Sequence, residues 1–190
     1  DPERFLDIST MMKPLDSKGA VGHFHADHSR RVSILCAGIG RVMHVDAKAL
    51  FYAGALHDVG KLLIKHSTLG KSHGWTPKDS KEMECHVFDS YRILRDKFNF
   101  TAEIILWHHK FQKNAYPRKM PRPLLNWDEG SRVMIPFYGR LLMLADVYDA
   151  MHRIYQDDDG NDLVPIEADI KERLKRVNPD LIPLIDDLYK

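Results

Sequence analysis

Apolar side chains recur along most of the chain at spacings of three and four residues, which is the period of an amphipathic helix. The stretch 22–45 carries one such stripe, made of Val32, Leu35, Ile39 and Val42. The same period predicts further helices over about 46–57, 76–97, 101–107, 137–155, 166–177 and 181–188. No segment alternates apolar and polar residues in the manner of a strand. The pattern therefore predicts an all-α fold, a single-domain helical bundle of about six to eight helices.

Helix start signals agree with this division. Candidate N-caps precede three of the predicted helices: Asp46, Thr76 and Thr101. Thr76 is followed by a proline and then by an aspartate in the first turn, which is typical of a capped helix start. The stretches 66–75 and 110–136 are interpreted as loops. The second is long for a passive connection in a compact domain, so we expect it to form a wall or lid of a substrate cleft.

Several histidines lie on the apolar faces of these helices. Three of them continue an apolar stripe at helical spacing: His28, His57 and His86. The pair His108 and His109 follows two isoleucines by four residues, so at least one of the pair faces inward. A single inward histidine is more often a hydrogen-bonded core residue than a metal ligand. The five together favour a common site over five separate core residues.

Two aspartates strengthen that interpretation. Asp58 directly follows His57, and the turn expected at Gly60 would aim Asp58 and Lys61 back toward the same centre. Asp146 lies among apolar neighbours, where a carboxylate is costly unless it is paired or bound to a metal. Imidazoles and carboxylates are ligands for divalent ions. Five imidazoles and two carboxylates can hold two such ions, and a two-metal site clamps both sides of an in-line phosphoryl displacement.

Composition and charge narrow the expected partners. The formal net charge of +1 gives no electrostatic case for duplex nucleic acid or a membrane surface. No apolar run approaches the roughly 18 residues of a spanning helix. The two cysteines, Cys36 and Cys85, provide no disulfide framework, so we expect a cytoplasmic location. The basic residues within 110–136 suit a phosphate-bearing substrate or, equally, a solvated loop.

The chain divides into a lead-in or linker over residues 1–21 and a single domain over residues 22–190. It begins with Asp1 rather than Met, so we expect an excised domain with a sensory domain upstream. A homodimer is a further expectation.

The chemistry-bearing residues form five ordered motifs: His28-Ser29-Arg30-Arg31, His57-Asp58-Val59-Gly60-Lys61, His86, His108-His109 and Ala145-Asp146-Val147-Tyr148-Asp149-Ala150. In this order they resemble the HD superfamily of metal-dependent phosphohydrolases, and within it the HD-GYP branch, over about residues 22–156. The resemblance implies a helical bundle of the HD type. It also implies a phosphodiesterase that opens cyclic di-GMP to linear pGpG, and in some members cuts on to GMP, by metal-hydroxide attack.

The resemblance assigns roles to individual residues. The implied metal ligands are His28, His57, Asp58, His86, His108, His109 and Asp146. Asp58 would bridge two divalent ions, with iron or manganese expected, and Lys61 would hold a phosphate oxygen, so these two are the catalytic residues. The implied substrate contacts are Lys61, Arg31, Asp149, Arg153 and Tyr116. Members with three ions carry a glutamate four residues before the first ligand histidine, where this chain has Phe24.

The loop after His108-His109 departs from the family pattern. The family has an acidic residue followed by Gly-x-Gly-Tyr-Pro, whereas this chain reads Lys110-Phe111-Gln112-Lys113-Asn114-Ala115-Tyr116-Pro117. The departure keeps three interpretations open. The first is a cyclic dinucleotide phosphodiesterase, the second an HD phosphohydrolase for another nucleotide or phosphate ester, and the third a degenerate cyclic-dinucleotide-binding signalling module.

Overall fold

The computed structural model describes residues 10, 13, 19–71, 73–153, 155–156 and 162–190, so most of the expected lead-in, residues 1–21, lies outside the described part. Eight α-helices occur in the described residues: α2 (Gly19–Val42), α3 (Ala47–Leu56), α4 (His66–Leu69), α5 (Pro77–Leu94), α6 (Asn99–Ile105), α7 (Glu129–Met151), α8 (Glu167–Val177) and α9 (Ile182–Leu188). Two 3-10 helices, η1 (Val59–Leu63) and η2 (Pro179–Leu181), join them. The strands β1 (Tyr155–Gln156) and β2 (Asp162–Leu163) form a single short antiparallel pair. The all-α prediction is confirmed.

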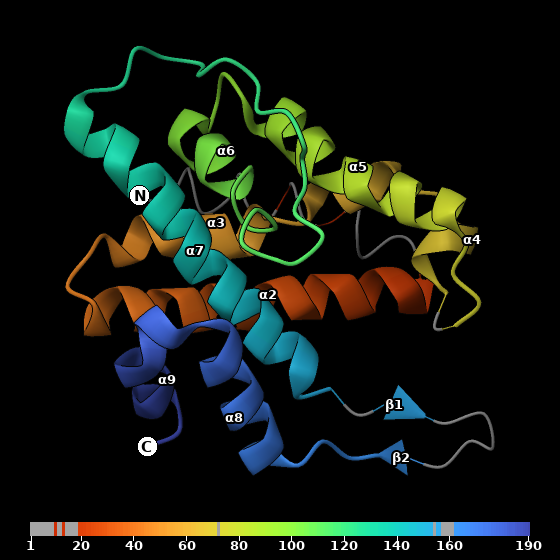
Figure 1. The fold of residues 1–190 in the computed structure, drawn as a ribbon. Helices are drawn as coiled ribbons and strands as arrows, with labels where there is room; N and C mark the ends of the chain where they lie inside the picture. Colours follow the sequence, from red (N-terminus) through yellow and green to blue (C-terminus); the bar gives the residue numbers. More distant parts are fainter. Residues whose placement is uncertain (1–9, 11–12, 14–18, 72, 154, 157–161) are drawn as a thin grey trace.

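Helix α2 is the longest element and lies across the middle of the molecule (Figure 1). The chain turns back after α2 into α3. Helix α7 runs diagonally across both helices and contacts each of them. Side chains from all three helices make up the core, among them Val32, Ile39, Leu50, Leu56, Leu141 and Leu144, all of them buried. Each contributes about 1.5–3 kcal/mol through burial. None of the described helices is both long and apolar enough to cross a membrane.

Two of the three predicted N-caps are confirmed. The carboxylate of Asp46 accepts hydrogen bonds of 2.9 Å from the backbone of Lys48 and Ala49 at the start of α3. Thr76 and Asp79 form a reciprocal capping box at the start of α5. Each cap contributes about 1 kcal/mol, because it satisfies amide groups that the first turn leaves without partners.

Several predicted boundaries are wrong, among them the end of the helix expected over 137–155, which stops at Met151. Thr101 does not cap a helix but is buried inside α6, because the chain enters that helix two residues earlier, at Asn99. The stretch 66–75 is not all loop, since α4 occupies part of it. Helix α7 begins at Glu129 rather than near 137, because Asp128 caps it and accepts a 2.9 Å hydrogen bond from Ser131. Pro136 therefore lies inside α7, where proline removes one backbone hydrogen bond without ending the helix.

The connection between α6 and α7, residues 106–128, is fastened to the body of the domain. Its middle is held by a 2.6 Å hydrogen bond from the backbone amide of Leu124 to the buried carboxylate of Glu103. Near its end, Trp127 packs edge-on against Phe100 with ring centroids 5.6 Å apart. These contacts hold the segment against the body of the domain, and its role as a wall or lid of a substrate cleft stays a prediction.

Candidate metal centre

Residues in or next to six separate elements meet inside the bundle. His28 comes from α2, His57 ends α3, Asp58 leads into η1, and His86 comes from α5. The turn after α6 supplies His108 and His109, and α7 supplies Asp146. Six of these residues form two groups of three, and within each group the ligand atoms lie within 4.8 Å of one another. One group is His86, His108 and His109, and the other is His28, His57 and Asp146.

Asp58 lies between the two groups and presents one oxygen to each. Its Oδ1 is 3.3 Å from Nε2 of His86, and its Oδ2 is 3.3 Å from Nε2 of His57. The Nζ of Lys61 donates a 2.6 Å hydrogen bond to the same Oδ2. A carboxylate placed in this way can bridge two cations while the lysine remains beside them.

The histidine rings are oriented by hydrogen bonds on their outer nitrogens. The Nδ1 atoms of His57, His86 and His108 donate to the backbone carbonyls of Gly54, Met83 and Ile105, over 2.8, 2.6 and 2.6 Å. Each acceptor carbonyl lies three residues earlier in the chain. It belongs to the helix that carries the histidine or that ends just before it. This arrangement fixes the tautomer and leaves the unprotonated Nε2 facing the centre.

Four of the inward nitrogens have no hydrogen-bond partner among the described residues. They are Nε2 of His57, His86 and His108, and Nδ1 of His109. A buried polar atom without a partner costs about 1–3 kcal/mol, so four of them facing one another would be strongly unfavourable in a purely structural core. Divalent cations bound among these side chains would satisfy them, and the donor set of nitrogens and carboxylate oxygens fits such ions.

The electrostatics of the rings also favour ligation. Burial lowers the pKa of His86 to about 3, and burial together with the neighbouring His109 holds the pKa of His108 well below its usual value. Both rings are therefore neutral, which is the form that binds metal. Burial also acts to lower the pKa of His57, but the adjacent Asp58 carboxylate outweighs it and raises that pKa.

The two central carboxylates remain ionised. Burial would raise the pKa of Asp58, but His57 and Lys61 outweigh this effect and hold it well below the ordinary value. The pKa of Asp146 is lowered in the same way, through its 3.0 Å contact with Nε2 of His28. The centre thus presents anionic oxygens together with the neutral rings of His86 and His108.

Gly60 allows the segment that carries Asp58 to lie directly against α5, which carries His86. A Cβ on this residue would lie 2.1 Å from the carbonyl oxygen of His86 and 2.5 Å from the amide nitrogen of Ser90. The hydroxyl of Ser90 accepts from the amide of Gly60 and donates to the carbonyl of His57, both over 2.8 Å. The glycine therefore allows η1 to lie directly against α5, which sets the spacing between Asp58 and His86.

Asp149, which was expected to contact substrate, makes hydrogen bonds within the protein. Its Oδ2 accepts a 2.7 Å hydrogen bond from Nδ1 of His28, and its two oxygens accept from Arg31 over 2.6 and 3.1 Å. It holds the ring of His28 with Nε2 toward the centre, as the backbone carbonyls do for the other histidines. Half of the Arg31 side chain remains exposed.

Tyr116 and Arg153 border the centre. The Tyr116 ring stacks on His109 with centroids 4.4 Å apart, and burial raises the pKa of its hydroxyl. The Arg153 guanidinium lies 4.9 Å from the centre of the Phe24 ring. Substrate contacts by Arg31, Asp149, Arg153 and Tyr116 stay predictions.

Two residues of the site were not predicted from sequence. Ser90 was interpreted only as part of a helix stripe, although it bonds to both sides of Gly60. His25 is buried, and its Nδ1 lies 3.5 Å from Nζ of Lys61. Its spacing of three before His28 was a signal, since residues at this spacing share a helix face.

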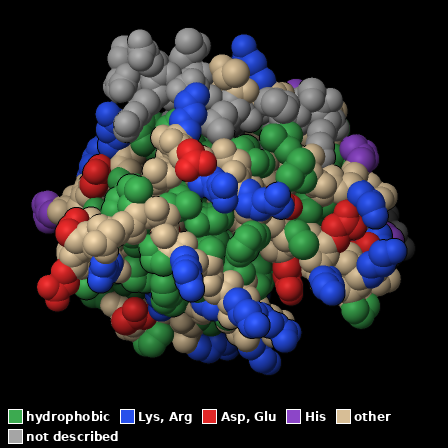
Figure 2. All heavy atoms as spheres, turned by 90° about the horizontal axis from the view of Figure 1, so that it is seen from above, with side chains coloured by type: hydrophobic (Ala, Val, Ile, Leu, Met, Phe, Trp, Pro, Cys, Tyr) green, Lys and Arg blue, Asp and Glu red, His purple; other side chains and the backbone are tan. Residues whose placement is uncertain are grey.

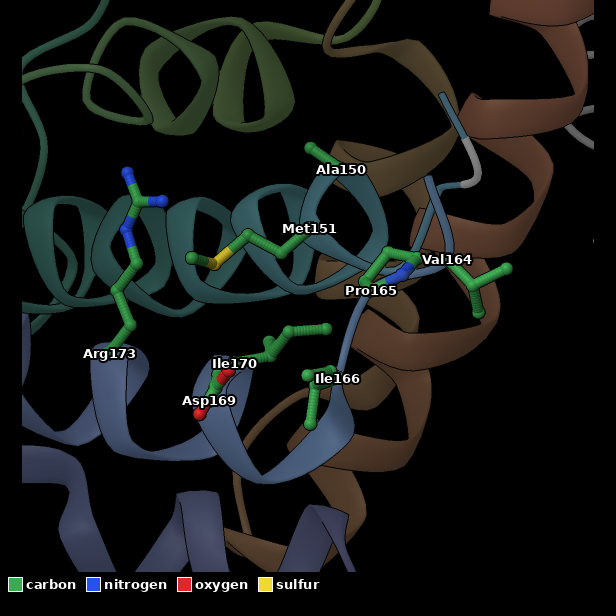
Figure 3. Close-up of a pocket in the computed structure, with 8 residues that line it drawn as sticks. All are labelled: Ala150, Met151, Val164, Pro165, Ile166, Asp169, Ile170 and Arg173. Atoms are coloured by element: carbon green, nitrogen blue, oxygen red, sulfur yellow. The ribbon is translucent and has the colours of Figure 1, made fainter. Parts of the chain in front are cut away.

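Cavities identify the open side of the centre. A cavity near the end of α7 is lined by side chains of α7, of α8 and of the segment just before α8, mostly apolar but including Asp169 and Arg173, and it does not include the histidines (Figure 3). Another, of about 630 Å³, includes Lys61 and His25 and so adjoins the metal centre. Viewed from the side of the α6–α7 connection, the molecule shows many Lys and Arg side chains and fewer acidic ones (Figure 2).

Comparisons with known proteins agree with this geometry. The chain is 28% identical over 168 residues to a 3'3'-cGAMP-specific phosphodiesterase 2 of Vibrio cholerae, covering 83% of this chain and 30% of that protein. It is 30% identical over 132 residues to a cyclic di-GMP phosphodiesterase of Thermotoga maritima, covering 65% of this chain and 33% of that protein. The chain therefore spans about a third of the length of these curated relatives.

The fold is also similar to that of solved structures. The crystal structure of the L. monocytogenes phosphodiesterase PgpH HD domain superposes with a TM-score of 0.60 at 16% identity, covering 90% of this chain and 83% of the other. The same domain has also been solved in complex with cyclic-di-AMP. The family description "HD domain" matches residues 26–151, which include both metal-ligand groups and Asp58. The chain belongs to the HD domain family.

Proposed function

We propose that this domain is a metal-dependent phosphodiesterase that hydrolyses a cyclic dinucleotide. The observation that carries the proposal is the position of Asp58, with one carboxylate oxygen toward each group of three ligands and Lys61 bonded to it. Two divalent ions held by these residues would suit a phosphodiester, because both the attacking and the leaving oxygen need stabilisation.

The proposed ligands are His28, His57, Asp58, His86, His108, His109 and Asp146. Two divalent ions bound there supply a nucleophilic water and neutralise the phosphate charge. Iron or manganese fits the mixture of imidazole and carboxylate donors.

The chain's own residues hold the reacting groups in place. Asp58 and Asp146 provide fixed negative charge. Backbone carbonyls orient the rings of His57, His86 and His108, and Asp149 orients that of His28. Lys61, a point charge beside Asp58, binds a non-bridging oxygen of the phosphate. Hydrolysis breaks one P–O bond and adds the elements of water across it, which leaves a linear product with one phosphomonoester and one hydroxyl.

The substrate class is supported by the relatives, which are named as phosphodiesterases for 3'3'-cGAMP and for cyclic di-GMP. Within this class we propose cyclic di-GMP, opened to linear pGpG and further to GMP. The altered loop that ends at Tyr116-Pro117 keeps another nucleotide or phosphate ester as the second candidate. A cytoplasmic location, an upstream sensory domain and a homodimer stay predictions.

One experiment separates the candidates. The purified domain is loaded with iron or manganese, its metal content is measured by elemental analysis, and turnover is followed by chromatography of linear products. The panel contains cyclic di-GMP, 3'3'-cGAMP, cyclic di-AMP and bis(p-nitrophenyl) phosphate. Opening of a cyclic dinucleotide supports the proposal, whereas turnover of the synthetic diester alone supports the second candidate. Metal binding with no turnover of any member would indicate a binding module.

A further inference from the structure

A cavity of about 630 Å³ begins at Lys61 and continues away from the metal centre. Its walls come from the first turns of α2, the segment that follows α4, and Arg153 after the end of α7. The volume lies within the range of small-molecule sites, about 300–1,000 Å³. Because Nζ of Lys61 is 2.6 Å from Asp58, a phosphate held at the centre would have its next substituent at the mouth of this cavity.

Two aromatic side chains line the cavity and remain accessible. Phe24 is 47% exposed and Trp75 is 42% exposed. Accessible aromatic faces bind nucleobases by stacking, because every base has a π-face. Phe24 stands where other members have a third-metal ligand, so at this position the chain has an apolar ring in place of a carboxylate.

The charged lining is entirely basic among the described residues. Lys61, Lys71 and Arg153 contribute to it, and no acidic side chain does. The carboxylate of Asp79 holds Lys71 at 2.5 Å, which fixes its position at the wall. The Nε of Arg153 is buried and has no hydrogen-bond partner among the described residues. Such a lining suits an anionic group placed next to an aromatic one.

We propose that this cavity binds the nucleotide adjoining the cleaved phosphodiester, with Trp75 and Phe24 stacking on its base and Arg153 and Lys71 near its phosphate. The inference rests on the proposed function. It adds that the substrate must carry a nucleobase next to the phosphate that is cleaved. Simple phosphate esters and sugar phosphates would leave both aromatic faces unused.

The test measures binding separately from turnover. A hydrolysis-resistant bis-phosphorothioate analogue of cyclic di-GMP is titrated into the metal-loaded domain by calorimetry, with inorganic pyrophosphate as a ligand that lacks a base. The variants are Trp75→Ala, Trp75→Phe and Phe24→Ala. Phe88→Ala serves as the matched control, because Phe88 is 37% exposed and lies outside the cavity. Circular dichroism and metal content verify that each variant is folded and loaded.

Trp75→Ala and Phe24→Ala should each weaken binding of the analogue by about 5- to 100-fold, the range of a lost base stack. Trp75→Phe should retain most of the affinity, and Phe88→Ala all of it, while pyrophosphate binding should stay unchanged in every variant. Analogue affinity that is the same in Trp75→Ala, Phe24→Ala and Phe88→Ala would overturn the inference. In that case turnover by the wild-type domain would still support the proposed function. A wild type that binds the analogue through Trp75 but hydrolyses no cyclic dinucleotide would support the inference and contradict catalysis.

Discussion

The Nδ1 of His28 donates a 2.7 Å hydrogen bond to Oδ2 of Asp149, a residue 121 positions later in the chain. The Nδ1 atoms of His57, His86 and His108 donate to backbone carbonyls three residues earlier in the chain, whereas His28 depends on a side chain from a different helix. Asp149 in turn is held by Arg31, one turn from His28 on α2. The orientation of this ligand is thus set by the packing of α7 on α2.

Replacing Asp149 tests that relationship. We expect Asp149→Ala to weaken metal binding by about 10- to 100-fold, because His28 loses the partner that fixes its tautomer. Asp149→Asn should have a smaller effect, since an amide oxygen can still accept from Nδ1. Competition with a fluorescent chelator measures the affinity. Asp27→Asn is the control, because Asp27 lies on the same helix in an exposed pair with Arg30. Equal affinities for the two Asp149 variants and the control would show that the bond does not support ligation.

Asp58 and Lys61 should separate metal binding from substrate handling. Asp58→Ala is expected to remove metal and activity together, because the carboxylate faces both ligand groups. Lys61→Ala should keep the metal and lower kcat/KM by about 10- to 100-fold, the cost of losing a charge-assisted hydrogen bond. Elemental analysis and steady-state kinetics give the two readouts. Full metal content and turnover in Asp58→Ala would mean that the site is elsewhere.

Gly60→Ala should destabilise the domain through backbone crowding. The new methyl group would overlap the carbonyl of His86, so η1 and α5 must separate, at a cost of about 1–3 kcal/mol or more. For a chain of this size the melting temperature should fall by about 3–10 °C. Gly38→Ala is the matched control, because a Cβ there meets nothing within 4 Å. Because alanine loses less backbone entropy than glycine when a helix forms, Gly38→Ala should raise the melting temperature slightly. Similar shifts for both variants would contradict the proposed crowding.

Metal removal should lower stability, because four inward ring nitrogens then have no partner. Ions present at about 1,000 times their dissociation constant stabilise the native state by about 4 kcal/mol per site. A chelator that empties both sites should therefore lower the melting temperature by about 15–30 °C, and the difference should shrink in His108→Ala. Elemental analysis of the loaded domain should give two ions per chain, since Phe24 cannot act as a third-site ligand. Three tightly bound ions, or a melting temperature indifferent to the chelator, would count against the centre.

The sequence determined the helical class and most helix positions, because these depend on local periodicity. The apolar stripe around Val32 and Ile39 and the caps Asp46 and Thr76 act within one or two turns of chain. The same local rules failed at Pro136 and Thr101. Helix α7 begins at Glu129, before Pro136, because packing against its neighbours outweighs the local effect of the proline. Helix α6 begins at Asn99, so Thr101 lies inside it and not at its start.

The sequence also indicated which residues could bind metal, since histidines and aspartates on apolar faces need a partner. It did not determine how they are shared. Only the tertiary structure placed Asp58 between two groups of three, turned Asp149 toward His28, and put Phe24 and Trp75 on one cavity. The residues in these contacts are tens of positions apart in the chain. The distances between their side chains depend on how closely the helices that carry them approach one another. Close approach is a property of packed surfaces, as at Gly60 against α5, and local sequence patterns do not encode it.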